Sequence, residues 1–175
     1  GRRWLANSFT NFVGLEDVRP LPRWPDARPV LIAASGPSLA EALPLITRHR
    51  TQLRLWALPS AAPALRAAGL TPDLVVLTDP GYFAVYHLHG AVPGGTPLVM
   101  PVSAGTGAWR LGARVSYFCQ GTVFEREILA AARVDGPTIL PSGTVSASAL
   151  ELALRSTEGP IVFAGLDLAF RDVHS

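Results

Sequence analysis

The sequence predicts an α/β protein with a mostly parallel sheet and helices on both faces. Short, continuous apolar runs such as Val30–Ala34 recur along the chain, as expected of strands that are buried on both faces. Segments with helical start and stop signals lie between these runs. The 16 glycines and 16 prolines are spread out as turn signals. Strands that alternate with helices in this way imply parallel pairing and a three-layer αβα arrangement.

The apolar runs locate the strands, and the capping signals locate the helices. The predicted strands are Val30–Ala34, Leu53–Leu58, Leu74–Leu77, Leu98–Met100, Val115–Phe118 and Ile161–Ala164, with a short extended segment at Thr138–Leu140. The predicted helices are Leu39–His49, Ala61–Ala68, Tyr82–Leu88, residues 123–132 and residues 144–155, and Gly105–Gly112 is a loop or a brief helix. Pro44 should bend or shorten the first of these helices. Three of them carry capping signals, which are Ser38 with Glu41, Ser60, and Thr122 with Glu125.

The first 28 residues differ from the rest of the chain. Arg2–Val13 is predicted to be a short helix, and Arg19–Pro29 carries four prolines and is expected to be an extended linker. We therefore divide the chain into an N-terminal helix with its linker, residues 1–28, and an α/β domain, residues 29–175. The chain starts at Gly1 and stops soon after the last predicted strand, so we expect a fragment of a longer protein.

Composition excludes several classes of function. The 175 residues are 49% hydrophobic and 16% charged, which is ample for a core, and a net charge of +2 is too weak to indicate nucleic-acid binding. All 15 basic residues are arginines, so a Walker lysine and a Schiff-base lysine are excluded within this segment. Cys119 is the single cysteine, which excludes an internal disulfide and favours a cytoplasmic setting. No membrane span is expected, because no apolar run approaches about 18 residues.

Ser35-Gly36-Pro37-Ser38 is the first candidate site. It directly follows a predicted strand and opens a helix, whose N-terminal N–H groups favour a phosphate or carboxylate. The segment is not a dinucleotide fingerprint, because Gly36 is its only glycine. An ordinary tight strand-to-helix turn explains the same residues equally well.

Two further aspartates follow predicted strands at the end where α/β sheets bind ligands. Asp79 lies in Thr78-Asp79-Pro80, and Asp167 lies in Gly165-Leu166-Asp167. If the third and last strands lie near each other, these carboxylates could share a cation such as Mg²⁺. The alternative is that each simply starts a turn. Asp73, at the other end of the third strand, is interpreted as structural.

Hydroxyl groups and glycine gather again ahead of the last predicted helix. Ser142, Gly143 and Thr144 could bind a base, a ribose or a phosphate. N-capping of the helix by Ser142 or Thr144 explains the presence of these hydroxyl residues equally well. His49 is assigned to a helix C-terminus, and Cys119 is expected to be a buried small side chain rather than a nucleophile. Candidate general bases are His87, His89 and His174, and the candidate positive side chains near a ligand are Arg110, Arg114 and Arg171.

These motifs together resemble a known family. They are Asn7 and Asn11 in the first helix, Gly36-Pro37-Ser38-Leu39, Gly69-Leu70-Thr71-Pro72-Asp73 leading to Thr78-Asp79-Pro80, Gly143-Thr144-Val145, and Gly165-Leu166-Asp167-Leu168-Ala169-Phe170. The order is similar to that of the MptE-like domain family, which includes archaeal 6-hydroxymethylpterin diphosphokinases and the central domain of the Maf flagellin glycosyltransferases. The resemblance covers nearly the whole chain.

The resemblance implies a Rossmann-like, sialyltransferase-like fold and a nucleotide-containing substrate. In the Maf branch a CMP-activated nonulosonic acid is the donor and flagellin the acceptor. In the diphosphokinase branch ATP, with Mg²⁺, donates a diphosphoryl group to a pterin alcohol. Gly36, Pro37 and Ser38, with Ser35 before them, would then lie against the nucleotide, as would Ser142, Gly143 and Thr144. Asp79 would stand at the catalytic cleft and Asp167 would close it.

Three functions stay open from the sequence. The frequent Ala, Arg, Pro and Gly residues indicate a GC-rich bacterial genome, and this favours the glycosyltransferase branch over the diphosphokinase. The third alternative is a non-catalytic nucleotide- or sugar-binding domain of a larger protein, whose partners would be its own further domains. One departure bears on this choice, because Pro59-Ser60 stands where many members carry a polar Asn-Ser turn.

Overall fold

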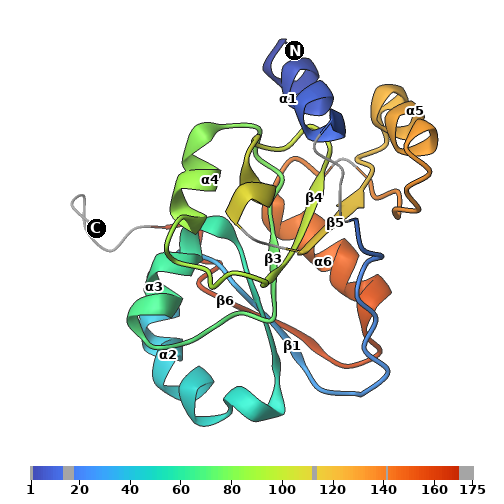
Figure 1. Ribbon diagram of the computed structural model, residues 1–175. Coiled ribbons are helices and arrows are strands. Elements are labelled where there is room, and N and C mark those ends of the chain that lie inside the picture. The colour runs from blue at the N-terminus through green and yellow to red at the C-terminus, as the bar shows by residue number, and fades with distance from the viewer. Residues whose placement is uncertain (1, 14–17, 112–113, 141, 170–175) are drawn as a thin grey trace.

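A computed structural model describes residues 2–13, 18–111, 114–140 and 142–169 of the chain. Its centre is a six-stranded sheet in the order β5-β4-β3-β2-β1-β6, and every strand pairing is parallel (Figure 1). The prediction of an α/β fold with a parallel sheet is confirmed. The strands are β1 (Val30–Ala33), β2 (Arg54–Ala57), β3 (Leu74–Val76), β4 (Pro97–Pro101), β5 (Arg114–Phe118) and β6 (Ile161–Ala164).

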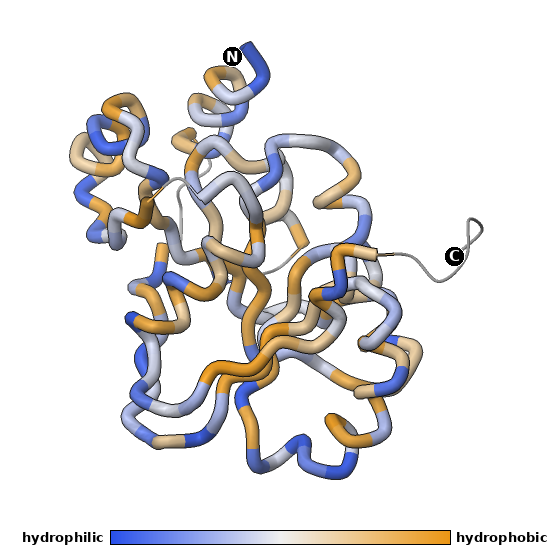
Figure 2. The backbone as a smooth tube through the Cα atoms, turned by 180° about the vertical axis from the view of Figure 1, so that it is seen from behind, coloured by the Kyte–Doolittle hydropathy of each residue, from blue (hydrophilic) through white to orange (hydrophobic). Residues whose placement is uncertain are grey.

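Helices cover both faces of this sheet and bury two separate apolar clusters. On one face lie α2 (Ser38–Arg48), α3 (Ala62–Ala67) and α4 (Tyr82–Leu88), and on the other lies α6 (Val145–Ser156) (Figure 1). Side chains alternate between the two clusters along each strand, so Leu55 and Ala57 face the first and Trp56 faces the second. Figure 2 shows the strands as the most apolar stretch of the chain, in the middle of the molecule.

The strand order creates a switch point between β1 and β6. From β1 to β5 each new strand is added on the same side, and the chain then returns to place β6 on the other side of β1. Right-handed crossovers in opposite directions lie on opposite faces of a sheet, which is why α6 lies opposite α2. In open α/β sheets ligands bind at the carboxyl ends of the strands beside such a switch point.

The N-terminal helix α1 (Arg2–Val13) docks at the carboxyl edge of the sheet through its polar side. The Asn7 amide donates to the carbonyls of Pro80 and Ser103, at 3.0 and 3.2 Å. The Asn11 amide donates to the carbonyls of residues 102 and 104, at 2.8 and 3.0 Å. The large apolar side chains of α1 are exposed instead, and these residues are Trp4, Leu5, Phe9, Phe12 and Val13.

Two of the predicted helix caps are confirmed and two are wrong. Thr122 caps α5 (Val123–Ala131) by accepting from the Glu125 N–H at 3.2 Å, and Thr144 caps α6 by accepting from the Ala147 N–H at 3.3 Å. The predicted Ser38 capping box does not form, because Pro37 is the N-cap residue and Ser38 is already inside α2. The Ser60 cap is also wrong, because a short 3₁₀ turn, Pro59–Ala61, precedes α3. Pro44 does not shorten α2, which continues to Arg48.

Candidate functional site

The carboxyl ends of β1 and β6 meet, and this contact brings together two of the motifs found in the sequence. The Ser38 N–H and the Ser38 hydroxyl both donate to Asp167 Oδ2, at 2.9 and 2.8 Å. The Gly165 N–H donates to Ser38 Oγ at 3.2 Å, and the Gly36 N–H donates to the Gly165 carbonyl at 2.7 Å. Four hydrogen bonds therefore join the turn after β1 to the turn after β6.

Both glycines of this contact are required by how closely the two turns approach. A Cβ on Gly36 would collide with Asp167 Oδ2 and would lie 2.5 Å from the Gly165 carbonyl oxygen. Gly165 has a φ of +76°, which L side chains rarely adopt, and a Cβ there would collide with the Ala34 carbonyl. Gly165 is buried, whereas the Asp167 side chain is exposed at the edge of the sheet.

Asp79 lies at the same edge, after β3, and starts a turn. Its Oδ1 accepts from the Gly81 N–H at 2.5 Å, and its carbonyl accepts from the Gly105 N–H at 3.0 Å. The Asn7 amide of α1 holds the next carbonyl, that of Pro80. The turn interpretation of Asp79 is therefore realised, and its exposed carboxylate still faces solvent at the carboxyl edge.

The condition for a cation shared by Asp79 and Asp167 is not met. Strands β3 and β6 are separated by β2 and β1. Three strand spacings amount to roughly 14 Å, whereas a bound cation holds its oxygen ligands within about 2.6 Å. Among the described residues no group of three His, Cys, Asp or Glu side chains is placed to hold a metal ion. The two carboxylates do not fit one Mg²⁺ site.

The N-terminus of α6 reaches the carboxyl edge from the other face of the sheet. Residues 137–139 pair in parallel with Cys119, directly after β5, since Cys119 donates to the Pro137 carbonyl and accepts from the Ile139 N–H. The hydroxyls that follow bond to the backbone at the start of α6 and to one another, with Ser142 Oγ 3.1 Å from Ser148 Oγ and Thr144 Oγ1 3.2 Å from Ser146 Oγ. The capping role of Thr144 is confirmed, and ligand binding by Ser142, Gly143 and Thr144 stays a prediction.

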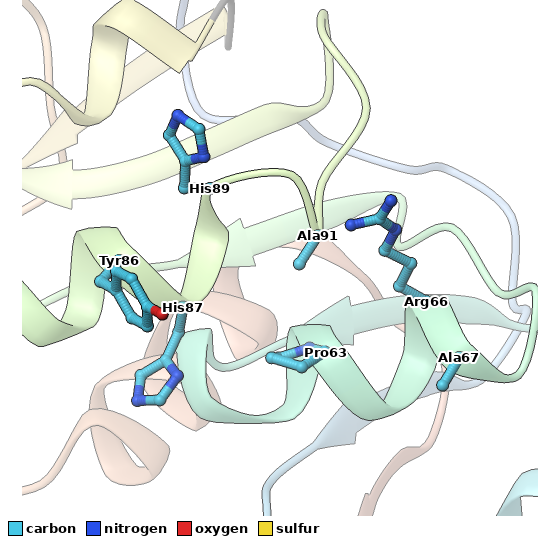
Figure 3. Close-up of a pocket in the computed structure, with 7 residues that line it drawn as sticks. All are labelled: Pro63, Arg66, Ala67, Tyr86, His87, His89 and Ala91. Carbon is cyan, nitrogen blue, oxygen red and sulfur yellow. The ribbon is translucent and has the colours of Figure 1, made fainter.

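Several other candidates lie away from this edge. Arg114 begins β5 and so lies at the opposite, amino end of the sheet. His87 and His89 lie at the end of α4, where they line a cavity of about 610 Å³ with Arg66 and Tyr86 (Figure 3). Figure 3 shows the His89 ring pointing away from the His87 ring, so the two imidazoles do not converge on one ligand. His174, Arg171 and the Arg110 side chain lie outside the residues that the structure describes.

The residues interpreted as structural have structural roles. Asp73 Oδ2 accepts from the Leu55 N–H at 2.8 Å and Asp73 Oδ1 pairs with Arg50 at 3.0 Å, which fastens β3 to β2 at the amino end. His49 is the C-cap residue of α2. Cys119 is buried, as expected.

Sequence reasoning missed a buried carboxylate beside the carboxyl edge. Glu125 is 2% exposed, and it accepts from the Ser103 hydroxyl at 2.6 Å and from the Gln120 N–H at 2.8 Å. These bonds tie α5 to the segment after β4 that α1 also holds. The Thr122–Glu125 spacing indicated a helix start, but it gave no sign that the Glu125 side chain turns toward Ser103 instead of the cap.

The fold and this edge define a doubly wound α/β domain with its switch point between β1 and β6. The family model described as "6-hydroxymethylpterin diphosphokinase MptE-like" matches residues 2–173, and the chain belongs to this MptE-like family. The resemblance seen in the sequence is thereby confirmed.

Similar proteins are longer than this chain. Two uncharacterized proteins of Treponema pallidum (strain Nichols) are 27% and 30% identical over 97% and 96% of the chain, which spans 31% and 36% of their lengths. The Maf glycosyltransferase of Magnetospirillum magneticum AMB-1 has a similar structure, with a TM-score of 0.72 and 20% identity over 99% of this chain and 28% of its own. In the described part of the chain no helix is both long and apolar enough to cross a membrane.

Proposed function

We propose that this domain belongs to a transferase that uses a nucleotide-activated donor, and that the donor is a CMP-linked nonulosonic acid transferred to a hydroxyl of flagellin. The observation that carries the proposal is the carboxyl edge of the sheet, where the turns after β1 and β6 meet at the switch point and where Asp79 and the N-terminus of α6 also lie. The similarity of the fold to a Maf glycosyltransferase supports this branch.

The proposed reaction needs a proton acceptor at the carboxyl edge. The acceptor hydroxyl attacks the anomeric carbon of the donor, the bond from that carbon to the phosphate oxygen breaks, and CMP leaves with both electrons of that bond. The hydroxyl proton passes to a general base. Asp79 is our candidate, because its carboxylate is exposed at this edge and the Gly81 N–H orients it. The other described candidates, His87 and His89, lie at the far end of α4.

Two alternatives remain as outcomes of the test. The description of the family names a 6-hydroxymethylpterin diphosphokinase, which would use ATP with Mg²⁺. A non-catalytic domain would bind a nucleotide or a sugar without turnover. A thermal-shift panel with CMP, CTP, ATP, GDP and UDP, each with and without Mg²⁺, separates them, since a ligand that binds the native state raises Tm. We expect a Mg²⁺-independent rise with CMP or CTP, whereas a Mg²⁺-dependent rise with ATP alone would favour the diphosphokinase.

Asp79→Asn tests the catalytic role. The Asn side chain can still accept from the Gly81 N–H, so we expect stability to change by less than about 1 kcal/mol. Loss of a general base should lower turnover by roughly 10²-fold or more. The measurement is release of CMP from the donor, alongside urea unfolding. Glu158→Gln is the matched control, because Glu158 is exposed at the opposite edge of the sheet. Unchanged turnover in Asp79→Asn would rule out this role.

A further inference from the structure

The N-terminus of α2 already holds an anion, and that anion is part of the protein. Asp167 Oδ2 accepts from both the N–H and the hydroxyl of Ser38, at 2.9 and 2.8 Å. A carboxylate in this position neutralises the partial positive charge of the helix end. It occupies the place where a helix N-terminus would otherwise receive a phosphate.

The donors of this turn are used within the chain. Gly36 donates to the Gly165 carbonyl, Leu39 to the Gly36 carbonyl, and Ala40 to the Pro37 carbonyl, while Pro37 has no N–H. With Ser38 bound to Asp167, each N–H from residue 36 to residue 40 therefore has a partner inside the protein. A phosphate at this turn would have to replace one of these bonds.

The glycine of the turn serves the same internal contact. A Cβ at position 36 would collide with Asp167 Oδ2, so the missing side chain makes room for the protein's own carboxylate. A second anion in this place would also meet the negative charge of Asp167 at close range. Gly36-Pro37-Ser38 and Gly165-Leu166-Asp167 are thus two halves of one contact.

We propose that Asp167 determines specificity by excluding phosphate from the switch point between β1 and β6 and by accepting a hydrogen bond from an uncharged hydroxyl or amine of the ligand. Both hydrogen bonds that the described residues donate to this carboxylate end on Oδ2, which leaves Oδ1 as the acceptor that the exposed side chain offers within the described part of the chain. A nucleotide would then lie with its nucleoside toward Asp167 and its phosphate away from it. The identity of the ligand rests on the proposed function, whereas phosphate exclusion does not.

Inorganic phosphate tests the exclusion directly. We expect the amide NMR signals of Ser38 and Leu39 to stay unchanged during a phosphate titration of the wild type. In Asp167→Asn the charge is removed while an acceptor for Ser38 remains. Phosphate should then shift these signals, with an affinity at least tenfold higher than any that the wild type shows. Ser38→Ala is the control, because it keeps the carboxylate and should still exclude phosphate. Phosphate binding at these amides with equal affinity in the wild type and in Asp167→Asn would overturn the proposal.

Cytidine and CMP test the second part of the proposal, the role of Asp167 as an acceptor for the ligand. If Asp167 accepts from the nucleoside, Asp167→Asn should weaken cytidine binding about tenfold, measured by calorimetry, because a charged acceptor is lost. Unchanged cytidine affinity in this variant would overturn the acceptor role. If the wild type binds neither cytidine nor CMP, the proposed nucleotide function fails, and the phosphate titration still decides whether Asp167 excludes anions.

Discussion

Tyr117 lies on β5 with a side chain that is 2% exposed, and desolvation by this burial raises the pKa of its phenol above the ordinary value of 10.0. The folded protein therefore keeps the phenol protonated at a pH where the unfolded chain has already released the proton. By thermodynamic linkage, the stability that this group contributes to folding is fully present below pH 10 and is lost as pH rises toward the folded pKa. Burial of Tyr117 thus limits the alkaline stability of the sheet.

Tyr117→Phe should remove this part of the pH dependence. Between pH 10 and 11.5 the unfolding free energy of the wild type should fall more steeply than that of the variant, and the difference in slope should approach about 1.4 kcal/mol per pH unit at the upper end of this range. Urea unfolding at several pH values measures both slopes, and other titrating groups contribute equally to the two proteins. Equal slopes in this range would contradict the burial argument. Tyr82, which is 71% exposed, provides the control as Tyr82→Phe.

At the scale of the element, α1 shows most clearly what the sequence could and could not predict. Its length and bounds follow from the pattern of the chain, and the structure has it at Arg2–Val13 as predicted. The aromatic side chains of α1 are exposed, and the residues that the helix buries are Asn7, Ser8 and Asn11. The reason is that its neighbour is a row of backbone carbonyls beyond β4, which need amide donors. A sequence does not show which unpaired carbonyls a distant helix will meet.

The packing of α1 can be tested with one polar and one apolar substitution. Asn11→Ala removes two donated hydrogen bonds to buried carbonyls and should cost about 1–2 kcal/mol of stability. Leu5→Ser changes a side chain that is 48% exposed and should stay within about 0.5 kcal/mol. Equilibrium unfolding in urea measures both. A larger loss from Leu5→Ser than from Asn11→Ala would mean that the apolar side of α1 is the buried one.

At the scale of the whole molecule, the strand order is the feature that no local pattern encodes. Strands that follow one another in sequence tend to be neighbours, and β1 to β5 obey this tendency. The last strand departs from it by pairing with β1, at the far side of the sheet from β5. That placement puts Asp167 against Ser38 and keeps it away from Asp79. The motifs could therefore be found from the sequence, but the way in which they combine depended on the topology.

The same topology predicts where ligand binding should be felt. The carboxyl edge gathers residues 35–38, 78–81 and 165–168, whereas residues 50–54 and 71–74 lie at the amino edge. If CMP binds at the switch point, it should slow amide hydrogen exchange in the first set of segments, because bound ligand suppresses local opening. Amide hydrogen exchange at the amino edge should slow only as much as bound CMP raises the free energy of global unfolding. Exchange measured by mass spectrometry with saturating CMP distinguishes the two edges. Protection at residues 63–67 and 86–91 instead would place the ligand in the α3–α4 cavity and contradict the switch-point site.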